Sequence, residues 1–377
     1  MIMKVLYLAP LPIDINKLDG VPKKIMDQAN ALYRHGLNVD IISYMDGKTI
    51  LINVESKNVL FLGKGTSKFD VITQASKIYA SYDAFYIRYP KSDCRFISFL
   101  KKIKRNSTKK IIVEIPTYPY DAQGKESLKG KFIGFVDRLF RLQLKNYVDR
   151  IVTFTGERSI FGIETLNTVN GFDFRKVTPI DTPIDTKKNV SLIAVSAMFV
   201  LHGYDRLING LADYYRNGGK RSITLHLVGE GNSLNMYRQL VRKGNLADHV
   251  IFHGRVFGNE LYSLYEGVAV GVNSLAIHRE RLEKESTLKT KEYSAMGLPI
   301  VSSSYVDAFT EVGNINYVFM IPADESYVDI ENLLTFIDGL YEKYSTKEIH
   351  NMVRTEASQV CDMLVSTKPI YNYYVQD

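Results

Sequence analysis

Short apolar runs alternate along this chain with longer stretches of helical spacing, and this alternation limits the folds available to it. The runs in the first half are "KVLYLAP" (4–10), "NVDIISY" (38–44), "AFYIRYP" (84–90), "KIIVEIP" (110–116) and "RIVTFT" (150–155). Those in the second half are "SLIAVSA" (191–197), "ITLHLVGEG" (223–231), "VIFHG" (250–254), "VAVGVNS" (268–274) and "PIVSSS" (299–304). Continuous apolarity is typical of strands covered on both faces, and strand-then-helix order is typical of parallel sheets. The sequence therefore predicts an α/β protein with two Rossmann-like, doubly wound parallel-sheet domains.

The segment 170–189, "NGFDFRKVTPIDTPIDTKKN", is predicted to join the two domains, because it contains glycine and prolines and has no apolar period. A length of 377 residues also favours two domains, since single cores stop growing at roughly 250 to 300 residues. We expect an N-terminal domain over 1–170, a linker over 171–189, a C-terminal domain over 190–355 and a helix over 356–377 that returns to the N-terminal domain. Facing domains of this kind would bind ligands in a cleft at the carboxyl ends of their strands.

The composition of the chain indicates its cellular compartment and the kinds of molecule that it binds. Cys94 and Cys361 lie far apart without metal-ligand neighbours, so neither a disulfide framework nor a zinc site is expected, and a reducing cytoplasm fits best. The apolar run in "MIMKVLYLAPLPIDI" is too short for a signal peptide or a membrane span, so we interpret it as a buried first strand. A net charge of +7 favours partners with phosphate groups or anionic membrane, whereas no basic run is long enough to select nucleic acid.

One loop in the first half is a candidate for phosphate contact. "LDGVPKK" (18–24) predicts a helix that begins near Pro22, with Gly20 before it and two lysines in its first turn. The free N–H groups and positive dipole end of such a helix attract phosphate. A capped surface helix without a ligand is the alternative.

Two loops in the second half are further candidates. "LVGEGNSL" (227–234) places Gly229 and Gly231 after a strand but lacks the third glycine of a dinucleotide fingerprint, so a tight turn without a ligand is equally compatible. In "AVSAMFVLHGYDRLINGL" (194–211), His202 precedes a helix and could donate to a phosphate, or could be an exposed loop histidine.

The stretch "RLEKESTLKTKEYSAMGLPIVSSS" (281–304) is more specific. A helix is predicted to start at Ser286-Thr287, so that the N–H groups of Thr287 and Leu288 face an anion. Glu292 follows on the same helix, and its carboxylate can accept two hydrogen bonds from a vicinal diol such as a ribose. A solvated charged face is the alternative. The apolar turn that ends at Gly297 indicates that the helix then enters the core.

"LKTKEYSAMGLPIV" (288–301) resembles the second half of the E-x7-E region of the GT-B-fold glycosyltransferases, especially glycosyltransferase family 4. "NGFDF" (170–174), "HGYDRLINGL" (202–211), "LHLVGEGNSL" (225–234) and "VIFHGRV" (250–256) resemble other blocks of that family in the same order. The resemblance covers nearly the whole chain. It implies a GT-B fold whose two domains face an interdomain cleft, a nucleotide-sugar donor held mainly by the second domain, an acceptor held mainly by the first, and retention of the anomeric configuration.

The resemblance also implies roles for individual residues. Glu292 would bind the donor ribose, and the amides of Thr287 and Leu288 would bind the diphosphate. The remaining implied contacts are Gly20 with the diphosphate, Gly229 and Gly231 along the nucleotide pocket, and Arg255 and Val256 beside the base. Where the family has an arginine and lysine pair, this chain has Met198 or a neighbour and His202. Lys284 stands where the sugar-contacting glutamate is expected, so either Glu285 takes that role or Lys284 supplies charge to the phosphate.

Cleavage of a sugar–phosphate bond builds negative charge on the leaving diphosphate, which N–H groups and cations stabilise. Because the sequence contains no D-x-D, we expect no metal or other cofactor, with Lys289 and Arg279 preferred as the stabilising cations and Glu285 as the third catalytic candidate. Glu114, Tyr118 and Asp121 in "VEIPTYPYD" (113–121) are candidates for the acceptor side, although packing of the loop by its tyrosines explains them equally well.

The segment 129–150, "KGKFIGFVDRLFRLQLKNYVDR", mixes basic and apolar residues in a helical pattern. A helix that buries its apolar stripe in the core is the interpretation we favour, since apolar stripes usually pack inward. The alternative is a basic amphipathic helix that rests on anionic lipid at the inner face of the cell membrane.

Together these features predict a cytoplasmic, metal-independent, retaining hexosyltransferase that acts on a saccharide or lipid-linked saccharide in surface polysaccharide or glycoconjugate biosynthesis. Two alternatives stay open: a non-catalytic, glycosyltransferase-like partner subunit and a sugar-nucleotide epimerase of the same fold.

Overall fold

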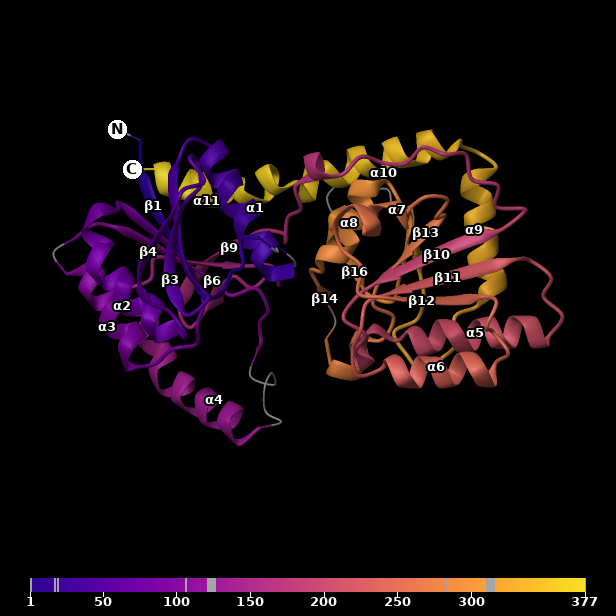
Figure 1. The fold of residues 1–377 in the computed structure, drawn as a ribbon, viewed down its shortest axis with the longest axis horizontal. Helices are drawn as coiled ribbons and strands as arrows, with labels where there is room; N and C mark the ends of the chain where they lie inside the picture. Colours follow the sequence, from indigo (N-terminus) through magenta and orange to yellow (C-terminus); the bar gives the residue numbers. More distant parts are fainter. Residues whose placement is uncertain are drawn as a thin grey trace. The chain divides into compact units, whose positions relative to one another are not determined.

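The computed structural model describes residues 2–16, 18, 20–105, 107–120, 127–282, 284–309 and 316–376, apart from the side chain of Glu285. The chain forms two compact units, shown in Figure 1: one combines Met1–Gly171 with Met363–Asp377, and the other is Phe172–Asp362. Residues 172–189, where a linker is predicted, are therefore counted with the second unit. The segment 356–377 is not one helix, because it contains the end of α10 (Thr346–Cys361) and the whole of α11 (Met363–Val375).

The first unit is built on a mixed sheet with the strand order β4-β3-β2-β1-β5-β6-β7-β9-β8. Its strands are β1 (Lys4–Pro12), β2 (Asn38–Met45), β3 (Lys48–Asn53), β4 (Val59–Lys64), β5 (Ala84–Arg88), β6 (Lys110–Glu114), β7 (Arg150–Thr153), β8 (Ser159–Ile160) and β9 (Ile163–Asn167). The strands from β2 through β1, β5, β6 and β7 to β9 pair in parallel. At the two edges, β3, β4 and β8 pair antiparallel, which the expectation of a purely parallel sheet missed.

Helices cover both faces of this sheet. They are α1 (Gly20–Arg34), α2 (Lys68–Ile78), α3 (Cys94–Lys104) and α11, whereas α4 (Leu128–Phe140) lies at the periphery of the unit (Figure 1). Side chains of α1 and α11 pack with alternate residues of β1, such as Val5 and Tyr7, in one core. Side chains of α2 and α3 pack with the intervening residues, such as Leu6 and Leu8, in the other core. This alternation along one strand explains why the strand is apolar throughout.

The second unit has a parallel sheet in the order β12-β11-β10-β13-β15-β17. Its strands are β10 (Val190–Val195), β11 (Ile223–Val228), β12 (Val250–Gly254), β13 (Val270–Val272), β15 (Ile300–Ser302) and β17 (Val318–Met320). The helices are α5 (Tyr204–Arg216), α6 (Leu234–Lys243), α7 (Gly258–Ser263), α8 (Leu288–Met296), α9 (Ile330–Tyr341) and α10. A core beneath α5, α6 and α9 covers one face of the sheet, and the ring of Tyr293 from α8 packs against Gly271 on β13.

Each apolar run quoted from the sequence overlaps a strand of one of these sheets, so the predicted α/β class is confirmed. The order within both sheets places the first strand of each unit, β1 and β10, in the interior of its sheet. Chain crossovers therefore run in both directions from that strand, as in doubly wound folds. The loops at the carboxyl ends of the central strands are the places where such folds bind ligands.

Candidate functional site

Buried polar side chains collect at the carboxyl ends of β13 and β15 in the second unit. Asn273 follows β13, and its Nδ2 donates to Oγ of Ser302 at 2.9 Å. Asn273 also accepts a 3.3 Å hydrogen bond from Oγ1 of Thr287, the residue that precedes α8. The serines at the end of the apolar run 299–304 are thus part of a polar network, and this network fixes the start of α8 against the sheet.

The first turn of α8 lies at this network. Thr287 has extended backbone angles and is the N-cap residue, but its side chain does not bond the N–H groups of the first turn. Its hydroxyl contacts Asn273 and Thr290 instead. The helix ends after nine residues at Gly297, whose φ of 82° is left-handed. An N-terminus whose cap residue leaves the first N–H groups to other partners is suited to an anion, as expected for Thr287 and Leu288.

Lys289 and His202 lie next to each other beside this N-terminus. Nζ of Lys289 donates to Oγ of Ser274 at 2.9 Å. Burial, followed by the nearby Lys289 charge, lowers the pKa of His202 to about 3. His202 is therefore neutral at physiological pH, so it contributes no positive charge to neutralise a phosphate. Its Nδ1 accepts a 3.0 Å hydrogen bond from the N–H of Phe199, which leaves the proton on Nε2 as a neutral donor.

Arg279 has two carboxylate partners in this structure. It lies in the 3-10 turn Ile277–Glu280, and its guanidinium forms a two-pronged pair with Asp205 at 2.7 and 2.9 Å. A second pair, with Glu325, joins the same guanidinium, and these hydrogen bonds raise the pKa of Arg279. The two carboxylates more than neutralise the single positive charge of the guanidinium. Arg279 therefore holds the start of α5 to neighbouring loops, and we no longer assign it as a cation for the diphosphate.

The segment before α8 is held by a buried ion pair that the sequence analysis missed. Lys291 on α8 is fully buried and pairs with Asp307, and Ser286 Oγ donates to the same carboxylate. Lys284 and Glu285 form the short strand β14 (Lys284–Glu285), which pairs with β16 (Tyr305–Val306). Lys284 is exposed, with its ammonium 5.8 Å from the centre of the Tyr305 ring. The side chain of Glu285 lies outside the described residues, so its predicted role stays a prediction.

The glycines of "LVGEGNSL" are required by packing against a neighbouring loop. Gly229 has a φ of 126°, and a Cβ atom on it would lie 1.9 Å from the carbonyl oxygen of Ser196. A Cβ atom on Gly231 would lie 2.4 Å from the carbonyl oxygen of Met198. The two glycines therefore let the turn after β11 approach the loop after β10. This packing accounts for both glycines without a nucleotide, whose contact with them stays a prediction.

The other predicted donor contacts lie on neighbouring parts of the second unit. Arg255 is exposed and pairs at 3.4 Å with Glu230, and Val256 beside it is nearly buried. Glu292 lies one turn into α8 and is partly buried. Burial, followed by the nearby Glu292 carboxylate, raises the pKa of Tyr265 well above its usual value. Glu292 therefore lies close to the buried Tyr265, which the sequence pattern did not reveal.

Glu114 in the first unit is a structural residue. It is fully buried, and its carboxylate accepts hydrogen bonds from Lys24 at 2.9 Å, Gln28 at 2.9 Å, Tyr86 at 2.5 Å and Arg88 at 2.5 Å. Burial alone would raise the pKa of Glu114, but the two cations and the Tyr86 hydroxyl lower it to about 2. A carboxylate with four donors has little capacity left for an acceptor substrate, so the acceptor-side assignment of Glu114 is withdrawn.

Three other residues of the first unit, Gly20, Tyr118 and Asp121, were predicted to contact a ligand. Gly20 is the exposed first residue of α1 with a φ of 46°, so the helix begins at Gly20 and not near Pro22 as predicted. Tyr118 packs edge-on against Tyr120 and Phe161, as the alternative of tyrosine packing predicts. Asp121 lies outside the described residues.

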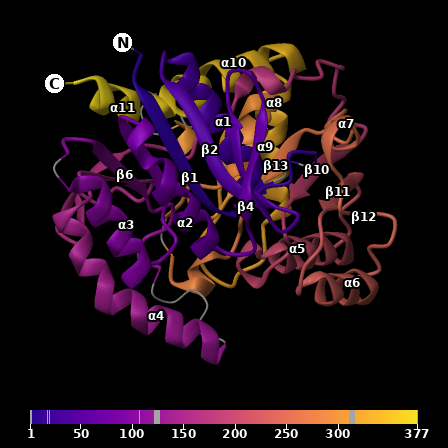
Figure 2. The same cartoon turned by 60° about the vertical axis from the view of Figure 1, so that its left-hand side comes forward.

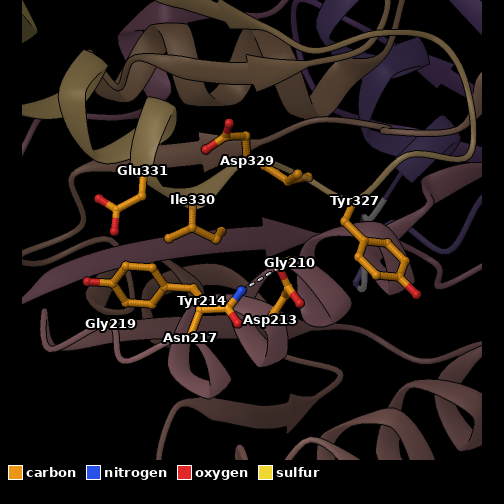
Figure 3. Close-up of a pocket in the computed structure, with 10 residues that line it drawn as sticks. Gly210, Asp213, Tyr214, Asn217, Gly219, Tyr327, Asp329, Ile330 and Glu331 are labelled. Carbon is orange, nitrogen blue, oxygen red and sulfur yellow. Dashed lines mark hydrogen bonds between the residues drawn. The ribbon is translucent and has the colours of Figure 1, made fainter.

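A pocket of about 350 Å³ lies elsewhere in the second unit, between α5 and the start of α9 (Figure 3). Its lining includes Asp213, Tyr214, Tyr327 and Glu331, and none of the residues assigned above to a site. The acidic side chains make it unsuited to a diphosphate. Across the residues that the structure describes, no group of three His, Cys, Asp or Glu side chains is placed to hold a metal ion. Nor does any helix in those ranges have the length and apolarity to cross a membrane.

One comparison with known protein families covers most of the second unit. Residues 189–335 match the family "Glycosyl transferases group 1", and the first turn of α8 lies inside the matched region. A search of curated protein sequences finds no match.

Solved structures match almost the full length. A glycosyltransferase from Rickettsia africae ESF-5 has 14% identity and a TM-score of 0.64, with 100% of this chain and 99% of that chain covered. Sucrose-phosphate synthase from Thermosynechococcus elongatus has 12% identity and a TM-score of 0.63, covering 98% of each chain. Anabaena HepE, in complex with UDP and glucose, has 15% identity and a TM-score of 0.62, covering 98% of this chain and 99% of its own.

The TM-scores over nearly the whole chain establish a shared fold, and the family match supports sugar transfer as the general activity. The chain has the GT-B fold of these glycosyltransferases, and its second unit carries a region that matches the group 1 glycosyltransferases over residues 189–335.

Proposed function

We propose that this protein is a retaining glycosyltransferase of the hexosyl-transferring class, which moves a sugar from a UDP- or GDP-sugar to a saccharide or lipid-linked saccharide. The expected setting is the synthesis of surface polysaccharide or glycoconjugate in the cytoplasm, with peripheral attachment to the cell membrane. The observation that carries the proposal is the first turn of α8, where Lys289 and the neutral His202 lie together inside the region that matches the family.

The chemistry follows from the charge that develops during transfer. As the bond between the sugar and the diphosphate breaks, negative charge grows on the leaving diphosphate. The N–H groups at the start of α8, the Lys289 ammonium and the Nε2–H of His202 would bind that charge. A metal ion is not required in this proposal, because these groups supply positive charge and donors themselves. Binding of UDP with glucose by HepE supports a UDP-sugar as the first donor to test.

A non-catalytic partner subunit is the second candidate, because Arg279 is already neutralised by Asp205 and Glu325. Such a subunit would bind a saccharide or a sister transferase without cleaving a donor. Release of UDP or GDP from a nucleotide sugar by the purified protein supports the transferase. An epimerase of the same fold would instead interconvert nucleotide sugars, which product analysis of the same reaction detects. Thermal stabilisation by a panel of nucleotide sugars identifies the donor to use, since a ligand of the folded state raises its apparent stability.

Replacing Glu292 by Gln is expected to weaken binding of the nucleoside diphosphate about 10- to 150-fold, because hydrogen bonds to a charged acceptor contribute about 1.5 to 3 kcal/mol. The substitution keeps the shape of the side chain and removes its charge, so folding should change little. Calorimetric titration with UDP and with GDP measures the effect.

Glu331→Gln is the matched control, since Glu331 lines the pocket beside α9 rather than the α8 site. Unchanged nucleotide affinity in a folded Glu292→Gln protein would refute the ribose assignment. If only Glu331→Gln weakens nucleotide binding, the donor site would instead be assigned to the pocket that Glu331 lines.

A further inference from the structure

The helix α4 turns its apolar side chains toward solvent, opposite to the packing we favoured from the sequence. The exposed apolar residues are Leu128 (85%), Phe132 (67%), Phe135 (58%) and Leu139 (59%), followed by Leu142 (59%) in the 3-10 turn Arg141–Asn146. Their spacing of three and four residues puts them in one stripe along the helix. Large side chains exposed singly are ordinary, whereas a continuous stripe marks an interaction surface.

The opposite face of α4 already has its partners. Asp137 is buried, and its carboxylate accepts hydrogen bonds from the Tyr89 hydroxyl at 2.5 Å, the Ser92 N–H at 2.6 Å and the Tyr120 hydroxyl at 2.8 Å. These bonds fix the rotation of α4 on the first unit. The apolar stripe therefore cannot turn inward without breaking them. Figures 1 and 2 both show α4 at the periphery of its unit.

The charges around the stripe have one sign. Exposed cations flank it at Lys129, Lys131 and Arg138, and Lys145 follows in the 3-10 turn. Asp137 is the single acidic residue between 127 and 146, and it faces inward. The outer side of this helix thus combines an apolar stripe with positive charge and no acidic side chain. Such a surface suits a bilayer of anionic lipid, whose headgroups attract the cations while its acyl boundary takes up the aromatic and aliphatic side chains.

We propose that the outer face of α4, made by Leu128, Phe132, Phe135 and Leu139 with Lys129, Lys131 and Arg138, attaches the protein to an anionic lipid surface. This proposal places the membrane contact on α4. It does not require that the protein transfers a sugar. A membrane-bound enzyme of this kind would meet a lipid-linked substrate in two dimensions. The test below measures binding without any donor or acceptor, so its result is separate from that of the proposed activity.

Co-sedimentation with vesicles tests the proposal. The wild-type protein should bind vesicles of equal parts phosphatidylcholine and phosphatidylglycerol, and should bind pure phosphatidylcholine vesicles much more weakly. The triple variant Lys129→Gln, Lys131→Gln, Arg138→Gln should bind the anionic vesicles about 100-fold more weakly, at about fivefold for each cation. Phe132→Ser with Phe135→Ser should weaken the same binding about tenfold or more. High salt should weaken wild-type binding.

Two control variants remove the same kinds of side chain, apolar or cationic, from surfaces away from α4. Leu60→Ser with Phe61→Ser changes two exposed apolar residues of β4, and Lys220→Gln with Arg242→Gln and Lys243→Gln removes three exposed cations of the second unit. Both should bind like the wild type. Equal binding to both kinds of vesicle, no vesicle binding, or equal losses in variants and controls would each overturn the proposal. A dimer in solution that Phe132→Ser with Phe135→Ser dissociates, without vesicle binding, would assign the stripe to a second copy of the chain instead.

Discussion

Replacing Lys289 by Met is expected to lower the rate of UDP or GDP release about 100- to 1,000-fold, with little change in stability. Loss of one preorganised group that stabilises developing negative charge typically costs this much in kcat. Lys289 lies at the first turn of α8 and donates to Ser274, so its ammonium is positioned before any ligand binds. Steady-state kinetics with the donor selected by thermal stabilisation measure the effect, and thermal unfolding checks the fold.

Lys284→Met is the comparison, because Lys284 is an exposed lysine on β14, just before the same helix. If the rate falls in Lys284→Met and not in Lys289→Met, the charge on the phosphate comes from Lys284. If neither substitution changes the rate, the placement of the diphosphate at α8 is wrong.

Replacing Glu114 by Gln is expected to destabilise the protein by about 3 to 5 kcal/mol at neutral pH, because it leaves two cations, Lys24 and Arg88, without their shared buried carboxylate. Urea unfolding followed by circular dichroism measures the loss. Glu164→Gln is the control, since Glu164 is largely exposed in its pair with Arg150, and a surface pair contributes about 0 to 1 kcal/mol.

The effect of Glu114→Gln should depend on pH in a defined direction. The pKa of Glu114 is lowered from 4.5 to about 2, because Lys24 and Arg88 outweigh the cost of burial. The carboxylate therefore contributes stability above a pH of about 4.5, and this contribution is lost as the pH falls through about 2. The difference between wild type and variant should shrink over that interval. A difference that stays constant would show that Glu114 acts by packing rather than by charge.

The central strands were predictable because each is buried on both faces, and continuous apolarity is a local property of the sequence. The hairpin of β2 and β3 was missed although its signal is present: Asp46-Gly47 occupies the turn, and both residues have positive φ. β17 was missed as well. It lies in the apolar run "YVFMI" (317–321), which was passed over although β13 and β15, also of three residues, were predicted from runs of similar length.

The helix start at Thr287 and Leu288 was predictable, because a helix N-terminus is encoded by neighbouring residues. The buried ion pair of Lys291 and Asp307 was not, since its partners come from two segments whose distance only the fold fixes. Glu114 was misassigned for the same reason. It follows a strand end, as a site residue does, but Lys24 and Arg88 reach it from distant positions. The orientation of α4 was misjudged because a stripe in the sequence does not say which side of the helix meets the protein.

The position of α11 in the first unit bears on the order in which a ribosome can complete the two units. Ile370 and Tyr374 of α11 belong to the core that also holds α1, and the Tyr374 hydroxyl donates to the Phe85 carbonyl at 2.8 Å. The second unit is one continuous segment, Phe172–Asp362, which emerges before α11 does. During synthesis the N-terminal domain usually folds first. Here the second unit can be completed before the first, because the first unit also needs α11. Until residue 374 leaves the ribosome, the apolar surface of the first unit that α11 covers in the folded protein is exposed to solvent.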